Sequence, residues 1–120
     1  GTCTGLILMA SRVDDSRVQS LNLLNIGVVR NSYGRQVDSF TAPLDLVLGG
    51  ETVSLRGIFI RAPRISSVGS GTEVLGSLEG EPVMVQENHF LGCTFHPELS
   101  DSTAVHDYFV SMVKELEFAG

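Results

Sequence analysis

The sequence predicts an α/β fold, in which short strands form a sheet and helices pack against it. Three features of the 120 residues support this prediction. Residues 1–5, Gly-Thr-Cys-Thr-Gly, lead into an apolar run and have the form of a nucleophile elbow, a sharp turn from a strand into a helix. Short apolar stretches alternate with turn residues between positions 21 and 95. Apolar side chains then recur at helical spacing between positions 105 and 116.

The first half of the chain predicts one helix and two strands. Residues 6–10 are apolar on every side, as expected of a short helix buried against a sheet. Residues 11–19 are polar and charged and predict an exposed loop. Residues 21–29, rich in leucine, isoleucine and valine, predict a buried strand. A second strand is expected over residues 37–46, where Pro43 indicates an edge strand or a short one.

The second half predicts further strands joined by tight turns. Residues 49–51, Gly-Gly-Glu, predict a turn, and residues 57–63 a short strand ended by proline. Residues 74–78 and 82–86 predict a hairpin-like pair, and residues 89–95 predict one more strand.

The chain ends in a predicted amphipathic helix, with its N-cap within the Ser-Asp-Ser sequence at residues 100–102. The expected apolar face is formed by Val105, Tyr108, Phe109, Met112, Val113 and Leu116.

Composition limits the possible partners. The chain carries 14 acidic and 8 basic residues, for a net charge of -6, and 42% of its residues are hydrophobic. A core can therefore form within one domain or part of one, while nucleic acid and anionic membranes are poor partners. No apolar stretch has the length of a membrane span, and no signal peptide opens the chain. Two cysteines make no disulfide framework, which favours a reducing, cytoplasmic setting.

Cys3 is the candidate nucleophile. In an elbow it would lie at a helix N-terminus, where unpaired N–H groups and the helix dipole favour the thiolate. Gly1 and Gly5 would leave room where a side chain would collide with neighbouring backbone. The alternative is a buried structural cysteine beside glycines.

His96 and Glu98 are the candidate base and its orienting carboxylate. In an extended segment alternate side chains share a face, so these two would point the same way across Pro97. With Cys3 they would supply a nucleophile, a general base and a group that holds the imidazole tautomer. The alternative for His96 is a solvated histidine at a strand end.

No metal site is expected. Cys93 and His96 are separated by an odd number of positions, which puts them on opposite faces of a strand, and no second Cys/His pair exists. The remaining histidines, His89 and His106, are expected to face solvent.

With these motifs in place, nearly the whole chain resembles one family, the glutaminase subunit of pyridoxal 5′-phosphate synthase, a class I glutamine amidotransferase. The elbow and the His-Pro-Glu motif are shared by class I amidotransferases at large, whereas Arg-Asn-x-x-Gly-Arg-Gln and Phe-Ile-Arg-Ala-Pro are more particular to this subunit. The matching stretches are residues 1–7, 30–40, 59–63 and 94–99.

The resemblance implies the C-terminal portion of a flavodoxin-like mixed-sheet domain. Residues 1–120 would be a partial glutaminase domain that lacks the family's N-terminal strands and its oxyanion-hole glycine loop, so weak activity is expected of this chain alone. Residues 49–51 look like that loop, but they follow the cysteine in a turn and are not assigned its role.

The resemblance also implies site residues and a reaction. Cys3 would be the nucleophile, His96 the acid/base and Glu98 its orienter. Glutamine contacts are implied at Arg30 and at residues 60–61, Ile60 and Arg61, although strand-end arginines are otherwise simply solvated.

The implied reaction is hydrolysis of L-glutamine to glutamate and ammonia, without a cofactor. The ammonia would pass to the synthase subunit of a hetero-oligomer that makes pyridoxal 5′-phosphate. Two alternatives stay open: a glutaminase that serves another pathway, and a non-catalytic fragment that retains only partner contacts.

Overall fold

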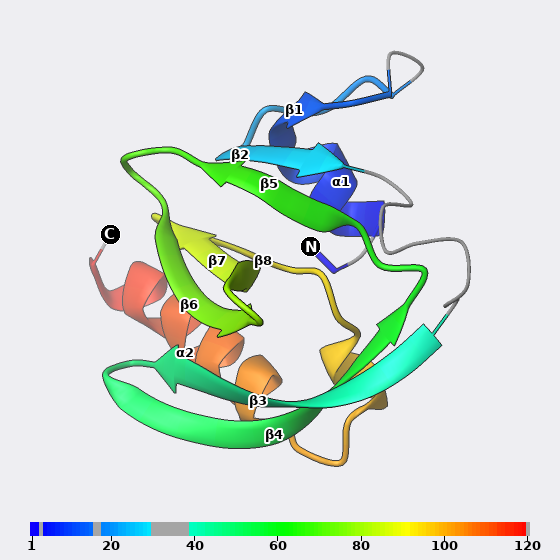
Figure 1. Ribbon diagram of the computed structural model, residues 1–120. Helices are drawn as coiled ribbons and strands as arrows, with labels where there is room; N and C mark the ends of the chain where they lie inside the picture. Colours follow the sequence, from blue (N-terminus) through cyan, green and yellow to red (C-terminus); the bar gives the residue numbers. More distant parts are fainter. Residues whose placement is uncertain (3, 16–17, 30–38, 120) are drawn as a thin grey trace.

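The computed structural model describes residues 1–2, 4–15, 18–29 and 39–119, with the backbone alone at residues 4 and 115–119 (Figure 1). Its elements are α1 (Thr4–Met9), β1 (Ala10–Val13), β2 (Leu24–Val29), β3 (Ser39–Leu48), β4 (Glu51–Ile60), β5 (Arg64–Val68), β6 (Glu73–Leu78), β7 (Glu81–Glu87), β8 (Phe90–Cys93), the 3₁₀ turn η1 (Pro97–Leu99) and α2 (Ala104–Ala119).

The described strands form three ladders. β1 runs parallel to β2, and β2 pairs antiparallel with β5. β6, β7 and β8 form an antiparallel meander, and β3 pairs with β4 as a hairpin. In Figure 1 the meander lies between the β1–β2–β5 sheet above and the β3–β4 hairpin below, with α2 beside the meander and the hairpin. The mixed α/β class predicted from the sequence is confirmed.

The β3–β4 hairpin is set by its turn. Gly49 has φ 60° and Gly50 has φ 84°, and positive φ at both central residues is what a two-residue type I′ turn needs. The register then continues without a break from Leu48↔Glu51 to Ser39↔Ile60. The predicted turn is confirmed, and Pro43 is tolerated within β3 because this strand pairs on one side only among the described strands.

The larger core lies between the hairpin, the meander and α2. β3 alternates buried leucines with exposed residues, so that Leu46 is fully buried. A Cβ built on Gly76 of β6 would lie 2.4 Å from Leu46 Cδ2, so the glycine lets β6 approach β3 closely. Phe59 and Phe95 are also fully buried, with ring centroids 5.8 Å apart.

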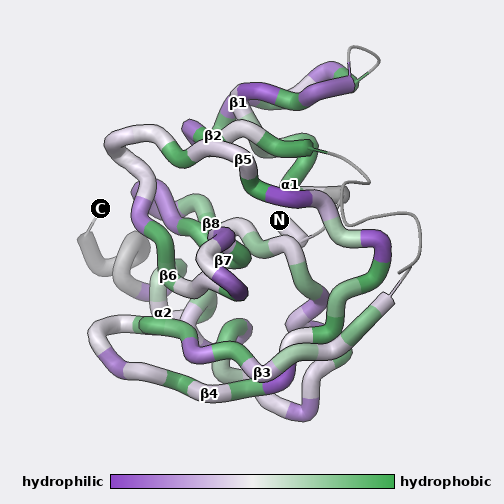
Figure 2. Tube along the Cα trace, in the orientation of Figure 1, coloured by the Kyte–Doolittle hydropathy of each residue, from purple (hydrophilic) through white to green (hydrophobic). Residues whose placement is uncertain are grey.

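The smaller core packs α1 against the strands. Leu6 of α1 and Leu24 of β2 are fully buried, and a Cβ on Gly92 of β8 would lie 2.4 Å from Leu6 Cδ1. Figure 2 shows this helix as an apolar stretch of the tube, whereas β1 beside it is largely hydrophilic. Leu8 is the exception to the predicted all-round burial of this helix, since it is 43% exposed.

Two strands contradict the sequence predictions. Residues 10–13 form β1 although a loop was expected from position 11, and the pattern gave no sign of β5. Their polar side chains have partners on neighbouring strands: Ser11 Oγ donates to the Leu24 carbonyl at 2.7 Å, and Arg12 donates to Asn25 Oδ1 at 3.0 Å and to Ser67 Oγ at 3.1 Å. A strand whose outer face is polar therefore looks like a loop in a search for apolar residues.

Strand boundaries also differ from the predictions. The strand expected over 21–29 begins at Leu24, and the one expected over 57–63 runs from Glu51 to Ile60 because it pairs with β3 along its whole length. The strand expected over 89–95 is β8, which ends at Cys93. Positions 37 and 38 lie outside the described residues.

The terminal helix is confirmed, but its apolar face is only partly covered by the described chain. Val105 and Met112 are buried, whereas Phe109 is 45% and Val113 is 39% exposed. The predicted N-cap is wrong by one position: the carbonyl that accepts the first helical bond, from the Asp107 amide at 2.8 Å, belongs to Thr103. Ser102 Oγ still satisfies one amide at this helix end, since it accepts a hydrogen bond from the Ala104 amide at 3.2 Å.

We predict that alanine substitutions at two neighbouring positions of β3 lower the free energy of unfolding by very different amounts. Leu46→Ala removes a fully buried side chain and should lower the free energy of unfolding by about 2–5 kcal/mol. Val47→Ala, on the 47% exposed face, should change it by less than about 0.5–1 kcal/mol. Urea titration of both variants measures this, and equal losses would contradict the assigned face of β3.

Candidate functional site

The start of the chain lies beside β8. The Gly1 nitrogen donates to the Leu91 carbonyl at 2.7 Å, and the Cys93 amide donates to the Gly1 carbonyl at 3.0 Å. Thr2 forms an isolated parallel bridge with Cys93. The segment that leads into position 3 is therefore held against the strand that leads towards His96.

The two glycines that flank position 3 differ in their surroundings. The Gly5 amide donates to the Thr2 carbonyl at 2.8 Å, which closes a tight turn at the start of α1. A Cβ on Gly1 would lie 2.7 Å from the Gly5 carbonyl carbon and 2.6 Å from Met9 Sδ, so the collision expected at Gly1 is confirmed. Apart from its chain neighbours and the backbone of its own helix, a Cβ on Gly5 would meet nothing within 4 Å among the described residues.

His96 and Glu98 meet as predicted, but not on an extended segment. His96 Nδ1 lies 2.6 Å from Glu98 Oε2. The segment forms the 3₁₀ turn η1, in which Pro97 occupies the first position and the Leu99 amide donates to the His96 carbonyl at 3.2 Å. Proline is favoured at the start of a helix, because its fixed φ fits and its missing N–H would be unsatisfied there. His96 and Glu98 therefore meet across one 3₁₀ turn and not on the shared face of a strand.

The charge on Glu98 fixes the direction of this hydrogen bond. Burial pulls the pKa of Glu98 upward, but hydrogen bonds from His96 and from its own backbone amide, with the charges of His96 and His106, hold that pKa below its ordinary value. Glu98 is therefore a carboxylate at neutral pH and can only accept, so Nδ1 of His96 carries the proton. The other ring nitrogen, Nε2, is left to accept a proton from another group.

The C-terminal end of β4 lies next to this turn. The His96 amide donates to the Ile58 carbonyl at 2.8 Å, two residues before Ile60. Arg61, which follows β4, has φ 45°, a left-handed conformation that is unfavourable for a residue with a side chain. Such backbone strain is found at functional sites, and it also occurs in this chain at Asn22, Glu79 and Asn88, so it is compatible with a role for residues 60–61 without assigning one.

The structure thus brings four of the six candidate residues to one region of the molecule, namely His96, Glu98, Ile60 and Arg61. Cys3 and Arg30 lie outside the described residues. A feature that the sequence did not indicate is Thr94, which is fully buried and whose hydroxyl has no hydrogen-bond partner among the described residues.

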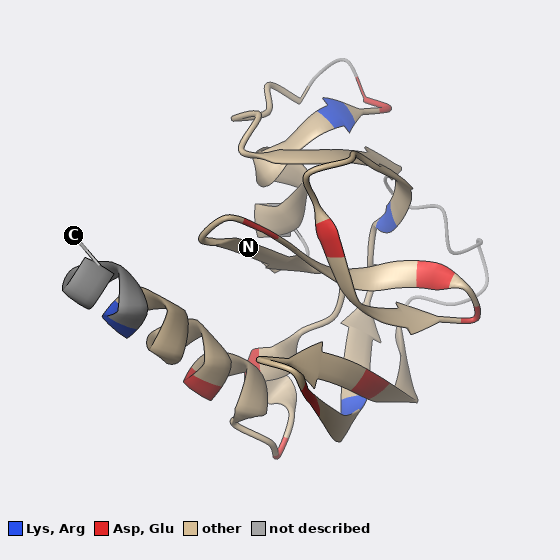
Figure 3. Cartoon of the chain, turned by 90° about the vertical axis from the view of Figure 1, so that its left-hand side faces the viewer, with Lys and Arg blue, Asp and Glu red and all other residues tan. Residues whose placement is uncertain are grey.

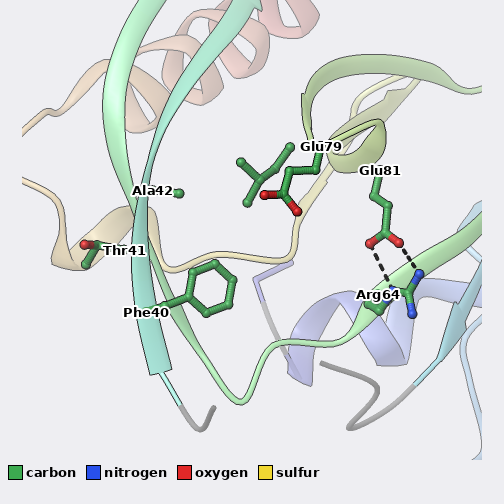
Figure 4. A pocket seen from close by; sticks show the side chains of 7 residues that line it. Phe40, Thr41, Ala42, Arg64, Glu79 and Glu81 are labelled. Atoms are coloured by element: carbon green, nitrogen blue, oxygen red, sulfur yellow. Dashed lines mark hydrogen bonds and ion pairs between the residues drawn. The ribbon is translucent and has the colours of Figure 1, made fainter. Parts of the chain in front are cut away.

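Two clefts are open on the described chain. One, of about 360 Å³, is lined by Ile58 and Leu99 and so flanks the His96 turn. The other, of about 440 Å³, lies between β3 and the β6–β7 turn (Figure 4). There Arg64 Nε donates to Glu81 Oε2 at 2.9 Å, with Phe40 on the facing strand. None of the four described site candidates lines this second cleft.

Three further features concern metal binding, membrane spans and the distribution of basic residues. No group of three or more His, Cys, Asp or Glu side chains among the described residues could hold a metal ion. None of the described helices is both long and apolar enough to cross a membrane. Figure 3 shows the basic residues of this part spread over separate elements rather than gathered on one face. His89 and His106 are exposed, as expected.

Comparison with known proteins places these observations in a family. Residues 1–115 match the SNO glutamine amidotransferase family. The "Pyridoxal 5'-phosphate synthase subunit PdxT" of Bacillus pumilus is 49% identical over 95% of this chain and 57% of its own length. The protein of the same name from Corynebacterium jeikeium is 48% identical over 96% of this chain and 60% of its own length.

A solved structure gives the same result. A crystal structure of a glutamine amidotransferase superposes with a TM-score of 0.84 at 40% sequence identity, over 93% of this chain and 58% of that one. The chain therefore spans less than two thirds of the length of the relatives it matches. Since the match covers residues 1–115, nearly all of the sequence, the chain belongs to the SNO glutamine amidotransferase family.

Proposed function

We propose that this chain carries a Cys-His-Glu triad that hydrolyses L-glutamine to glutamate and ammonia. The observation that carries the proposal is the 2.6 Å contact between His96 Nδ1 and Glu98 Oε2, in a member of an amidotransferase family. Cys3 supplies the nucleophile, and the pairing of Thr2 with Cys93 holds its segment against the strand that leads to His96.

The reaction proceeds through a thioester. His96 Nε2 takes the proton of the Cys3 thiol, and the sulfur attacks the side-chain carboxamide carbon of glutamine. The C–N bond breaks as His96 returns the proton to the leaving nitrogen, which departs as ammonia. Water, deprotonated by His96, then attacks the thioester and releases glutamate and the free thiol. Glu98 stabilises the imidazolium that forms at each step.

Substrate binding is assigned to Arg30 and to residues 60–61. Arg30 would pair with the α-carboxylate of glutamine, because a guanidinium fits a carboxylate with two parallel hydrogen bonds. Ile60 and Arg61 would contact the substrate through backbone as much as side chain, which is consistent with the left-handed conformation of Arg61. Their neighbour Ile58 is bonded to the His96 amide, so substrate held there lies close to the base.

The ammonia would serve the synthesis of pyridoxal 5′-phosphate. The relatives at 48–49% identity are named as subunits of that synthase, so we assign the partner as the synthase subunit in a hetero-oligomer. Passage of ammonia between the two subunits would keep it from escaping into the cytoplasm, where a thiol nucleophile also stays reduced.

The nucleophile assignment predicts unequal effects at the two cysteines. In the complete enzyme with its synthase partner, Cys3→Ala should abolish ammonia release from glutamine, because no other group in the triad can form the thioester. Cys93→Ala should leave the rate within about threefold, since Cys93 is 2% exposed and belongs to the core. A coupled assay for ammonia measures both, and comparable losses from the two substitutions would sink the assignment.

The lowered pKa of Glu98 predicts that its contribution to the free energy of unfolding is lost in acid. A carboxylate whose folded pKa lies below its ordinary 4.5 contributes stability above that pH and loses it as the pH falls through the folded value. The difference in free energy of unfolding between the parent and Glu98→Gln should thus be full above about pH 5 and shrink towards zero in stronger acid. Glu98→Gln should also slow glutamine hydrolysis at least about tenfold at neutral pH, because the imidazole tautomer is no longer fixed.

Urea titrations from pH 3 to 7 test the first expectation and ammonia release tests the second. A stability difference that grows on acidification would contradict the assigned role of the carboxylate. The matched control is Glu79→Gln, which changes the same charge in the β6–β7 turn and should leave hydrolysis unchanged.

Two substitutions of Arg61 distinguish backbone strain from substrate binding. Arg61→Ala and Arg61→Gly remove the same side chain, but only glycine relieves the positive φ, so the glycine variant should be more stable than the alanine variant by up to about 1 kcal/mol. Both should raise KM for glutamine more than they lower kcat. Thermal unfolding and steady-state kinetics measure these effects, and a glycine variant no more stable than the alanine one would show that the backbone is not strained.

A further inference from the structure

An ion pair joins the first residue of β5 to the first residue of β7. Arg64 Nε donates to Glu81 Oε2 at 2.9 Å and Arg64 Nη2 donates to Glu81 Oε1, so the guanidinium binds both carboxylate oxygens (Figure 4). The two strands belong to different sheets, since β5 pairs with β2, and β7 pairs with β6 and β8. The ion pair therefore links two sheets that no pairing among the described strands joins.

Arg64 follows the proposed substrate contact at Arg61 by three residues, on a connection with little slack. Residues 61–63 alone connect β4 to β5. The side chains of Ala62 and Pro63 within it are buried. Because three residues span at most about 10 Å, a displacement of Arg64 is passed on to Arg61.

The two ends of this connection are held in different ways. At the β4 end, the Ile58 carbonyl accepts a backbone hydrogen bond from the His96 amide at 2.8 Å. At the β5 end, Arg64 pairs with Val29 of β2, beyond a shift in the register of this ladder. Such a shift locally disrupts strand pairing, so the side-chain link from Arg64 to the meander supplies a second constraint where the ladder is irregular.

The surroundings strengthen this ion pair. Its two side chains are 41% and 33% exposed, in the cleft that Phe40, Ala42 and Leu78 also line. The Phe40 ring stacks on the buried Phe59 ring, with centroids 4.6 Å apart, which fixes the facing wall of the cleft. Apolar neighbours and a two-point contact distinguish this pair from a fully solvated one, which typically contributes little.

We infer that the Arg64–Glu81 ion pair holds residues 60–61 in the position in which they bind glutamine. This inference rests on the proposed function, because the substrate contact of residues 60–61 is part of that proposal. Both members of the pair are positioning residues, since they act through the connection and not on the reacting atoms. Loss of the pair should therefore weaken glutamine binding and leave the chemical step unchanged.

The first test is a double-mutant cycle on the complete enzyme with its synthase partner, made from the parent, Arg64→Gln, Glu81→Gln and the double variant. Each single substitution should raise KM for glutamine about two- to fivefold and leave kcat within about twofold. The double variant should have the KM of the single variants, because either substitution already breaks the pair. An unchanged KM, or rises that multiply in the double variant, would overturn the inference.

Glu79→Gln is the matched control for this cycle. Glu79 lines the same cleft and carries the same charge in the same turn, but it forms no ion pair among the described residues. Its substitution should leave both KM and kcat at the parent values. A rise in KM equal to that of Glu81→Gln would show that the charge of the cleft matters and not the ion pair.

The second test needs no glutamine. Hydrogen exchange, followed by mass spectrometry of a peptide that covers residues 59–66, compares the parent with Glu81→Gln and Glu79→Gln in the same complex. Loss of the pair should let the start of β5 open more often, so this peptide should exchange about two- to fivefold faster in Glu81→Gln. Exchange as slow as in the parent would overturn the inference, and Glu79→Gln should match the parent.

The two proposals fail in different ways. If the parent hydrolyses glutamine but Glu81→Gln changes neither KM nor exchange, the positioning role is wrong and the glutaminase proposal stands. If the parent complex releases no ammonia from glutamine, the glutaminase proposal is wrong and the substrate role of the pair is wrong with it, while the exchange experiment still shows whether the pair holds residues 61–63.

Discussion

The hydrogen bond from the His96 amide to the Ile58 carbonyl, at 2.8 Å, is the constraint on which the rest of the site depends. The His96 carbonyl is engaged as well, since it accepts from the Leu99 amide at 3.2 Å. With both backbone groups fixed, one between β4 and the turn and one within the turn, the imidazole can move only by side-chain rotation. The contact with Glu98 selects among those rotations, and little entropy remains to be lost when substrate binds.

The same strand, β8, organises the other side of the site. The Cys93 amide at its end donates to the Gly1 carbonyl, which holds the start of the chain as a parallel neighbour, and the segment that follows contains Thr94 and His96. Gly92 lets α1 pack close to it. Because these contacts involve backbone atoms, they depend on register and on small residues more than on the identity of the side chains around them. The meander can therefore hold the segments of the site through its backbone, while its other face packs into the larger apolar core.

The sequence was most informative where a local rule has a single physical cause. Two glycines predict the β3–β4 turn because few other residues adopt positive φ, and helical spacing predicts α2. β1 and β5 were missed because their polar faces are satisfied by partners far away in the sequence, such as Ser67 for Arg12. Phe109 and Val113 belong to the predicted apolar face of α2 but are exposed on the described chain, since periodicity reveals a face but not what covers it.

For the site, the motif indicated that His96 and Glu98 would meet but gave the wrong conformation for the segment between them. A proline fits both an extended segment and the first position of a 3₁₀ turn, so composition could not choose. The hydrogen bond from the His96 amide to the Ile58 carbonyl, a tertiary contact, favours the 3₁₀ turn. Neither the left-handed backbone of Arg61 nor the buried hydroxyl of Thr94 follows from any local pattern, because each breaks a local rule.

Such departures have a shared physical meaning. A strained backbone and an unpaired buried hydroxyl each cost stability, and the fold retains both within a few residues of the His96–Ile58 contact. Elsewhere in the described chain the buried side-chain polar atoms have partners, whereas positive φ recurs away from the site at Asn22, Glu79 and Asn88. The unpaired hydroxyl is therefore the more specific of the two departures, and a cost of this kind is compatible with a preorganised site, because groups held ready for a reacting charge cannot also be satisfied within the protein before that charge arrives.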